Sequence, residues 1–257
     1  MPQKIIYCDL DGTLIARGGK LSENNLNMLA KLQEAGVLTV LATGRNLYSL
    51  KKVVDSEQLW NYIVFSTGAG IVNWQSKEIL QKRSLNNEQV QEITELLWKE
   101  QVDTMIQEEV PENHYFTYRS FSEEENCQND FFYRLKLYRN FAEPWSRAGW
   151  QKKKASQLIA VLQENDERYE KLCEKLQKYS VIRATSPLDG RSIWLEIFAP
   201  GVSKAGAAEW LQNYKNSSAE TYALGNDHND FDLLLWAENS LIAKDSPIEL
   251  KEKFTIL

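Results

Sequence analysis

The chain has 257 residues and carries 36 acidic side chains against 30 lysines and arginines, so its formal net charge is −6. Apolar residues make up 43% and charged residues 26% of the sequence, which is ordinary for a folded protein of one large or two modest domains and argues against disorder. No apolar run reaches the roughly 18 residues of a membrane span. The acidic balance argues against a nucleic-acid partner, because phosphate recognition needs a basic stripe.

The amino-terminal stretch and the cysteines both indicate a cytoplasmic protein. Asp9 and Asp11 interrupt the first apolar run at the point where a secretory signal would continue. Cys8, Cys127 and Cys173 form no CxxC pattern, so we expect reduced thiols that pack in the interior. We therefore expect no membrane attachment, and a monomer or small homo-oligomer.

The first eighty residues alternate between short apolar runs and helical patterns. The pattern predicts strands over 5–8, 37–42 and 62–65, with helices over 22–36 and 47–56 between them. This alternation is typical of an α/β fold with a doubly wound, Rossmann-like parallel sheet. Such sheets bind ligands at the carboxyl ends of their strands, and all three predicted strands end in polar, glycine-containing segments.

The pattern changes after about residue 80 and returns near the carboxyl end. The intervening segments are a helix over 88–100, aromatic alternating strands over 114–118 and 131–135, a strand over 158–162, a helix over 167–179, and strands over 180–184 and 192–198. Strands and helices in this order favour an α+β insertion. A helix from Lys204 and strands over 222–224 and 239–243 then resume the alternation. We therefore predict a core of residues 1–80 and 186–257, with an inserted domain over 81–185.

The first polar segment, Asp9-Leu10-Asp11-Gly12-Thr13, places two carboxylates at a strand end. A carboxylate can attack a phosphoryl group once a metal ion neutralises the charge between them. A second carboxylic acid can protonate the leaving oxygen and later take a proton from water. The alternative interpretation is a solvated turn, which the segment alone leaves open.

Three further polar segments complement the aspartates. Thr43-Gly44-Arg45 offers a hydroxyl and a guanidinium to a phosphate, although a helix cap and a surface arginine would look the same. Lys204 lies in the first turn of a helix, where the helix dipole disfavours cations. A lysine at this position could screen the negative oxygens of phosphate and aspartate. The alternative interpretation is a solvated lysine. Residues 225–230, with the sequence GNDHND, carry the oxygen ligands that suit Mg²⁺, or form an Asx-rich loop.

Together these segments resemble the haloacid dehalogenase superfamily of phosphohydrolases, in its Cof-like, sucrose-phosphatase-like branch with a large cap after the third core strand. The resemblance covers the whole chain. It rests on five motifs in the family's order: DLDGT (9–13), ATGR (42–45), STGA (66–69), LEIFAPGVSK (195–204) and GNDHND (225–230). The inserted domain would then be the cap, which sets substrate specificity.

The resemblance implies roles for the residues of these motifs. Asp9 would be the nucleophile, Asp11 the general acid and base, and Lys204 the group that orients Asp9 and binds the phosphoryl group. Thr43, Gly44, Arg45, Thr67 and Gly68 would contact the phosphate or substrate. Mg²⁺ would be held by Asp9, Asp11 and Asn226, with Asn229 and Asp230 in support. The family usually has aspartate where this chain has Asn226, so Asp227 or Asp230 are alternative ligands, and it has Lys-Gly where this chain has Lys204-Ala205-Gly206.

These observations predict a Mg²⁺-dependent phosphatase that hydrolyses a small phosphorylated metabolite, with a sugar phosphate as the leading substrate class. A phosphomutase with the same aspartyl-phosphate chemistry and a non-catalytic phosphometabolite-binding protein are the alternatives. Basic cap residues are candidates for substrate contact, with Arg191 favoured and a solvated turn as its alternative: Arg134, Lys136, Arg139, Arg183 and Arg191.

Overall fold

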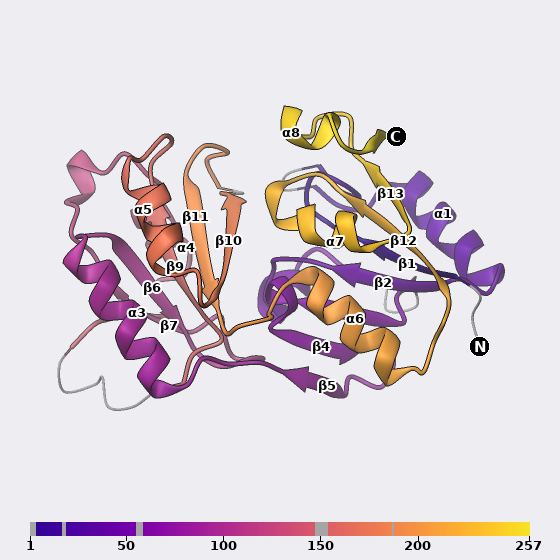
Figure 1. Cartoon of the computed structure of the whole chain (residues 1–257), viewed down its shortest axis with the longest axis horizontal. Coiled ribbons are helices and arrows are strands. Elements are labelled where there is room, and N and C mark those ends of the chain that lie inside the picture. The colour runs from indigo at the N-terminus through magenta and orange to yellow at the C-terminus, as the bar shows by residue number, and fades with distance from the viewer. Residues whose placement is uncertain (1–3, 17–18, 55–58, 147–153, 187) are drawn as a thin grey trace. The chain divides into compact units, whose positions relative to one another are not determined.

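The computed structural model describes residues 4–16, 19–54, 59–146, 154–186 and 188–257. The chain divides into two compact units, one of residues 1–82 with 202–257 and one of residues 83–201. Figure 1 shows the elements of each unit. Among the described residues, no helix combines the length and the apolar character that crossing a membrane requires.

The first unit is built from strands that alternate with helices along the chain. Its elements are β1 (Lys4–Cys8), α1 (Glu23–Glu34), β2 (Leu38–Ala42), α2 (Leu47–Leu50), β3 (Tyr62–Phe65), η2 (Ser66–Gly68), β4 (Gly70–Asn73), β5 (Ile79–Lys82), α6 (Lys204–Tyr214), β12 (Glu220–Gly225), η4 (His228–Asp230), α7 (Phe231–Trp236), β13 (Asn239–Ile242), α8 (Ile248–Lys251) and β14 (Thr255–Ile256).

Within the described residues these strands form one eight-stranded sheet in the order β14-β13-β12-β1-β2-β3-β4-β5. All pairs from β14 to β3 are parallel, and β4 and β5 extend the sheet as antiparallel strands. The strand β1 is central and buried, with the sequence IIYC from residue 5, as expected for a parallel strand covered on both faces. The predicted α/β fold with a parallel sheet is confirmed.

One face of this sheet packs against α6 and α7. Tyr7 and Val40 from the sheet join Ala207 and Leu211 of α6 and Leu233 of α7 in one buried cluster. Figure 1 shows both helices in front of the strands. Ser22 and Ser203 accept hydrogen bonds from Asn25 N and Gly206 N, and these bonds cap the starts of α1 and α6.

The glycine at residue 68 allows η2 to approach the start of α6. Gly68 has a φ of +102°, and a Cβ atom there would lie 2.2 Å from the carbonyl oxygen of Ser203. Gly36 also has a positive φ, +76°, but a Cβ atom there would meet nothing within 4 Å. Of these two glycines, Gly68 is therefore the one whose missing side chain permits a close contact, with the carbonyl oxygen of Ser203 at the start of α6.

This difference predicts unequal effects of two glycine substitutions. Gly36→Ala should lower the free energy of unfolding by about 1–2 kcal/mol, because only the backbone conformation opposes it. Gly68→Ala adds a clash with backbone and should cost ~2 kcal/mol more. Urea denaturation of both variants measures the difference, and equal losses would show that the α6 contact yields easily.

The second unit is an α+β domain. Its elements are α3 (Asn87–Lys99), β6 (Asp103–Gln107), β7 (Phe116–Arg119), η3 (Glu124–Asn126), α4 (Phe131–Leu137), β8 (Ala142–Pro144), β9 (Gln157–Leu162), α5 (Arg168–Lys175), β10 (Ser180–Thr185) and β11 (Ile193–Phe198). Its sheet has the order β10-β11-β9-β6-β7-β8, and every pair except β7 with β8 is antiparallel.

The predicted boundary at residue 186, where the chain was expected to re-enter the first unit, differs from the boundary in the structure. The strand β11 pairs with β9 and β10 in the second sheet, so the division lies between Gly201 and Val202. The first crossing, between Lys82 and Arg83, is close to the predicted residue 80. Sequence pattern could not separate the two sheets here, because β11 is as apolar and as fully buried as a core strand.

Two predicted elements are also different. Residues 131–135 were expected to form a strand, but they lie in α4. Phe131, Leu135 and Tyr138 pack into one hydrophobic cluster at spacings of four and three residues, which is a helical pattern hidden among adjacent aromatics. The helix expected over 47–56 ends at Leu50, and residues 55–56 lie outside the described residues.

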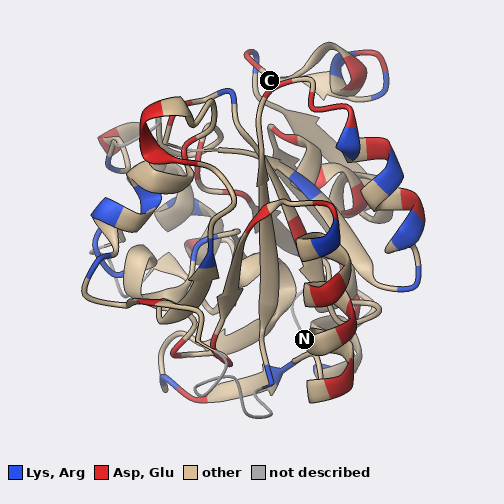
Figure 2. Ribbon diagram, turned by 90° about the vertical axis from the view of Figure 1, so that its left-hand side faces the viewer, with Lys and Arg blue, Asp and Glu red and all other residues tan. Residues whose placement is uncertain are grey.

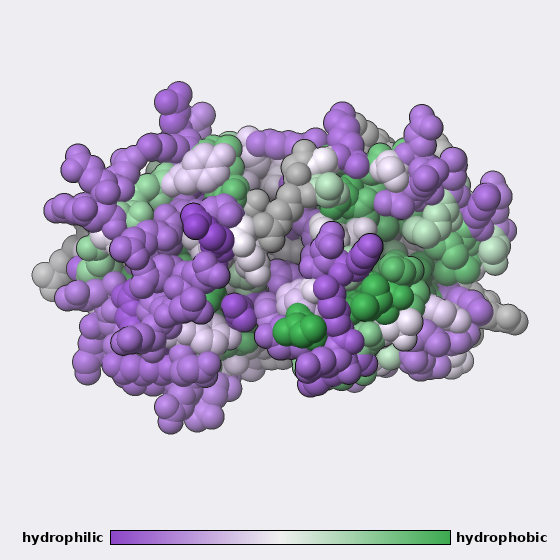
Figure 3. All heavy atoms as spheres, turned by 90° about the horizontal axis from the view of Figure 1, so that it is seen from above, coloured by the Kyte–Doolittle hydropathy of each residue, from purple (hydrophilic) through white to green (hydrophobic). Residues whose placement is uncertain are grey.

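Charged and apolar side chains of the described residues are spread over several elements. Figure 2 shows acidic and basic segments interspersed on the ribbon. Exposed apolar side chains of the first unit include Leu235, Ile248, Ile256 and Leu257, and Figure 3 shows apolar atoms as separate patches on a mostly hydrophilic face. The absence of nucleic-acid binding and the oligomeric state remain predictions.

Candidate active site

The candidate site lies at the carboxyl ends of four neighbouring parallel strands. Asp9 follows β1, Thr43 follows β2, Ser66 follows β3 and Asn226 follows β12. The backbone N–H of Asp9 donates to Leu224 O at 2.8 Å, so the start of the first loop is held against β12. Because parallel strands end at the same edge, four segments far apart in the sequence meet there.

The centre of the site is a buried lysine between two carboxylates. Lys204 Nζ donates to Asp9 Oδ1 at 2.7 Å and to Asp230 Oδ1 at 2.5 Å. The side chains of Lys204 and Asp230 are fully buried and that of Asp9 is 6% exposed. One ammonium therefore serves two carboxylates, which leaves the cluster with an excess negative charge.

The pKa values of this cluster follow from burial and from that excess charge. Burial, together with the negative charge of Asp230, raises the pKa of Asp9 to about 7, although Lys204 acts in the opposite direction. Burial alone would lower the pKa of Lys204, but attraction to Asp230 and Asp9 outweighs it and holds the pKa above its usual range. Lys204 is therefore a permanent cation that orients Asp9.

Asp230 positions the loop after β12. Its Oδ2 accepts hydrogen bonds from the backbone N–H of Asn226 at 2.9 Å and of Asp227 at 3.1 Å. Gly225 makes this approach possible, because a Cβ atom there would lie 2.6 Å from Asp230 Cβ. Both oxygens of Asp230 are thus used within the protein, and Asp227 accepts from His228 N at 2.8 Å. Asn226, in turn, places its side-chain amide 3.1 Å from Asp9 Oδ2.

Three oxygen-bearing groups converge beside Asp9. One atom of the Asn226 side-chain amide lies 2.9 Å from the carbonyl oxygen of Asp11 and 3.1 Å from both Asp9 Oδ2 and Thr13 Oγ1. Neighbouring ligands of octahedral Mg²⁺, at 2.0–2.1 Å from the ion, are about 3 Å apart. When the amide presents its oxygen, the distances from Asn226 Oδ1 to Asp9 Oδ2 and to Asp11 O therefore fit neighbouring ligands of Mg²⁺.

The carboxylate of Asp11 is bound by Arg45 rather than left free. Arg45 Nε and Nη2 donate to the two oxygens of Asp11, each at 2.6 Å, and Nη1 donates to Ser49 Oγ at 3.1 Å. Both side chains are about one-quarter exposed or less. Arg45 was expected to bind substrate phosphate, and the structure brings it to the site but onto Asp11.

The remaining predicted residues of the first unit line the same edge. Thr67 N donates to Thr43 O at 3.0 Å, and both side chains are buried. A Cβ atom on Gly44 would lie 3.5 Å from Thr67 Oγ1 and 3.6 Å from Asn229 Nδ2, which places Asn229 beside them. Thr67 has a φ of +55°, an uncommon conformation that is typical of functional loops.

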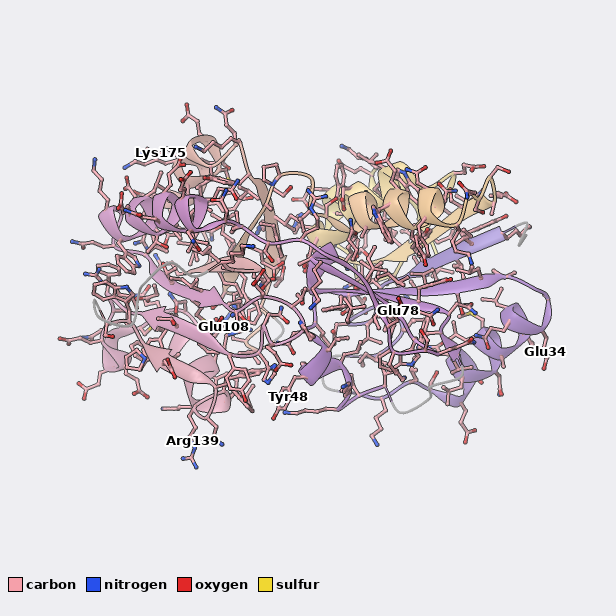
Figure 4. The ribbon with its side chains drawn as sticks, turned by 90° about the horizontal axis from the view of Figure 1, so that it is seen from below. Glu34, Tyr48, Glu78, Glu108, Arg139 and Lys175 are labelled. Atoms are coloured by element: carbon pink, nitrogen blue, oxygen red, sulfur yellow. The ribbon has the colours of Figure 1, made fainter. Side chains whose placement is uncertain are left out.

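The basic cap candidates belong to the second unit and differ in exposure: Lys136 is exposed and Arg183 is partly buried. Arg191 and Arg139 are exposed, and Figure 4 shows Arg139 projecting away from the ribbon. Arg134 is 8% exposed, and its guanidinium carbon lies 4.3 Å from the ring centroid of Trp194. Arg134 is therefore part of the interior of that unit, and substrate contact by Arg191 stays a prediction.

Sequence reasoning assigned no role to two residues that shape the site. Asp232 Oδ2 accepts from Ala205 N at 3.1 Å and fixes the first turn of α6. Thr13 Oγ1 contacts the Asn226 amide. Thr13 belonged to a quoted motif and could have been identified as a partner, whereas nothing in the spacing of Asp232 points to α6.

Comparison with known proteins gives a family for the whole chain. The sequence profile of the haloacid dehalogenase-like hydrolases matches residues 6–257. A 5-amino-6-(5-phospho-D-ribitylamino)uracil phosphatase of Bacillus subtilis is 26% identical over 118 residues, which are 43% of this chain and 47% of that protein. An HMP-PP phosphatase of Yersinia pestis is 35% identical over 63 residues, 24% of this chain and 23% of that protein. The aligned region thus spans less than half the length of these relatives.

Solved structures show the same fold over almost the whole chain. A sugar phosphatase of haloacid dehalogenase subclass IIB superposes with a TM-score of 0.74 and 17% identity, covering 98% of this chain and 92% of that one. A sequence identity of 17% supports a shared fold and does not by itself support a shared substrate. The resemblance predicted from the five motifs is confirmed by the family match.

Proposed function

We propose, from the premise that the chain belongs to the haloacid dehalogenase-like hydrolase family, that it is a Mg²⁺-dependent phosphatase of a small phosphorylated metabolite. The observation that carries the proposal is the buried Lys204–Asp9 contact of 2.7 Å beside the oxygens of Asp11 and Asn226. The two curated relatives are both named as phosphatases, which supports this reaction class, and a sugar phosphate is the substrate class we favour.

The geometry supports a two-step transfer. A carboxylate oxygen of Asp9 attacks phosphorus, the bond from phosphorus to the ester oxygen breaks, and Asp11 gives its proton to the leaving oxygen. Water then attacks the aspartyl phosphate, Asp11 takes a proton from that water, and the bond to Asp9 breaks to release phosphate. Lys204 and nearby backbone N–H groups stabilise the charge on the transferring group.

The cation would be held by Asp9 Oδ2, Asp11 O and Asn226 Oδ1. When bound, Mg²⁺ would supply neutralisation of the charge between Asp9 and the phosphoryl group. For Asp11 to act as an acid, its carboxyl must leave the Arg45 guanidinium, and an anionic substrate can compete for that guanidinium. The cap would provide closure over the site and substrate specificity.

The proposal predicts that metal removal abolishes phosphate release. Phosphate formed from p-nitrophenyl phosphate and from a panel of sugar phosphates should fall by at least ~100-fold in EDTA and return with added Mg²⁺. Full activity in EDTA would contradict the metal assignment, and no release from any substrate would contradict the phosphatase.

Product analysis distinguishes the two alternatives. A phosphomutase would convert one sugar phosphate into an isomer with little free phosphate. A phosphometabolite-binding protein would bind without turnover, and Asn226 is the feature that favours it, because the cation site has only one carboxylate ligand. Asp11 argues against it, because binding alone needs no acid beside Asp9.

A further inference from the structure

At the proposed cation site this chain has Asn226. Its side-chain amide carries an oxygen, which can bind a cation, and a nitrogen, which can only donate hydrogen bonds. Its inner atom faces Asp9 Oδ2, Asp11 O and Thr13 Oγ1 at 2.9–3.1 Å. If this atom is oxygen, it faces two other acceptors, Asp9 Oδ2 and Asp11 O, and a bound cation would stabilise that arrangement. If it is nitrogen, its two N–H groups can donate hydrogen bonds to two of these three oxygens at the same distances. The protein alone therefore favours the nitrogen, and the cation favours the oxygen.

The surroundings allow both orientations. Gly12 has a φ of +88°, and a Cβ atom there would lie 2.2 Å from the outer end of the amide, so the missing side chain leaves room for either group. Thr13 Oγ1 is a hydroxyl, which can donate to an inner oxygen or accept from an inner nitrogen. The Thr13 hydroxyl is therefore compatible with both orientations of the amide, although the two N–H groups that bridge Asp9 and Asp11 leave none for Thr13.

We propose that the Asn226 amide is an internal competitor for the cation: its nitrogen bridges Asp9 and Asp11 in the metal-free chain, and it turns its oxygen inward when Mg²⁺ binds. This inference rests on the proposed metal site of the phosphatase and goes beyond it. Aspartate at residue 226 could not donate, and it would add a negative ligand. The chain therefore binds Mg²⁺ more weakly than its aspartate variant, and its metal-free form is held together better.

The amide signals of Asn226 provide a direct test without turnover. In ¹⁵N-labelled full-length chain, the side-chain NH₂ pair of Asn226 is identified by its absence in Asn226→Asp. We expect both protons to exchange slowly with water in EDTA, and the pair to move on titration with Mg²⁺. Asn239 is the control, because its Nδ2 donates to Glu220 Oε1 at 3.0 Å on the exposed surface and should not respond.

Calorimetry and thermal unfolding test the consequence. Asn226→Asp should bind Mg²⁺ about tenfold or more tightly, because the ligand charge rises. Its melting temperature in EDTA should be lower than that of the natural chain, and its increase with Mg²⁺ should be larger. Asn226→Ala, which has neither end of the amide, should lose both the metal-free stability and the affinity.

The outcomes separate this inference from the proposed function. Mg²⁺ binding by calorimetry without any change in the Asn226 pair would overturn the rotation and leave the phosphatase standing. A rapidly exchanging pair in EDTA would overturn the donor role, as would equal melting temperatures in EDTA for the natural chain and Asn226→Asp. No binding of Mg²⁺ at millimolar concentration would overturn both.

Discussion

Asp9→Asn should lose at least ~10⁴-fold in the rate of phosphate release while the protein stays folded. The amide cannot form the covalent phosphoryl bond, and removal of one catalytic residue costs factors of about 10⁴ to 10⁶ in another class of hydrolase. Single-turnover phosphate release from the best substrate of the panel measures the loss. Substrate binding, followed separately by calorimetry, should persist.

The same variant should not be less stable than the natural chain, which distinguishes chemistry from folding. Asp9 and Asp230 share one buried ammonium, so a neutral amide at residue 9 leaves a balanced Lys204–Asp230 pair. Because the pKa of Asp9 is raised to about 7 in the folded chain, its ionised form opposes folding, and the natural chain loses this part of its stability as pH rises toward and through 7. The melting temperature of Asp9→Asn relative to the natural chain, in EDTA, should therefore increase from pH 6 to pH 8. If the melting temperature of Asp9→Asn at pH 8 were far below that of the natural chain, Asp9 would be mainly a structural residue.

Sequence predicted the parts of this site that depend on strand ends. Asp9, Thr43 and Asn226 each follow a buried apolar run, and parallel strands must bring such ends together. Lys204 was unusual at a helix start, and the sequence left open whether it screens phosphate and aspartate oxygens or is solvated; in the structure it contacts Asp9 and Asp230. Local pattern and sheet topology were sufficient for the residues at strand ends.

Sequence could not predict which partner each long side chain takes. Arg45 can reach a phosphate or Asp11, and only the placement of both loops decides between them. The support of the metal by Asp230 stays a prediction, and its contacts with Lys204 and two backbone N–H groups could not be read from the sequence. The boundary near residue 186 was missed because strand pairing, which is non-local, assigns β11 to its sheet.

Lys204→Met should strongly destabilise the first unit. It leaves Asp9 and Asp230 buried without a cation, and loss of one partner from a buried ion pair costs about 3–5 kcal/mol. That is a large share of a typical domain's stability of ~5–15 kcal/mol. Lys4→Met is the matched control in the same unit, because Lys4 is half exposed and pairs with Glu220 at 3.6 Å, so its loss should stay below about 1 kcal/mol.

In Lys204→Met, neutralising the two carboxylates that have lost their cation should restore stability but not phosphatase activity. Adding Asp230→Asn to Lys204→Met removes one unpaired carboxylate, and adding Asp9→Asn removes the other, so stability measured by urea denaturation should recover stepwise. The amide oxygen that Asp230→Asn introduces can still accept from the backbone N–H groups of Asn226 and Asp227, which keeps the loop in place. Activity should remain absent throughout, since the cation that orients Asp9 is missing. If Lys204→Met alone were as stable as Lys4→Met, the idea that the buried carboxylates of Asp9 and Asp230 depend on the Lys204 ammonium would be wrong.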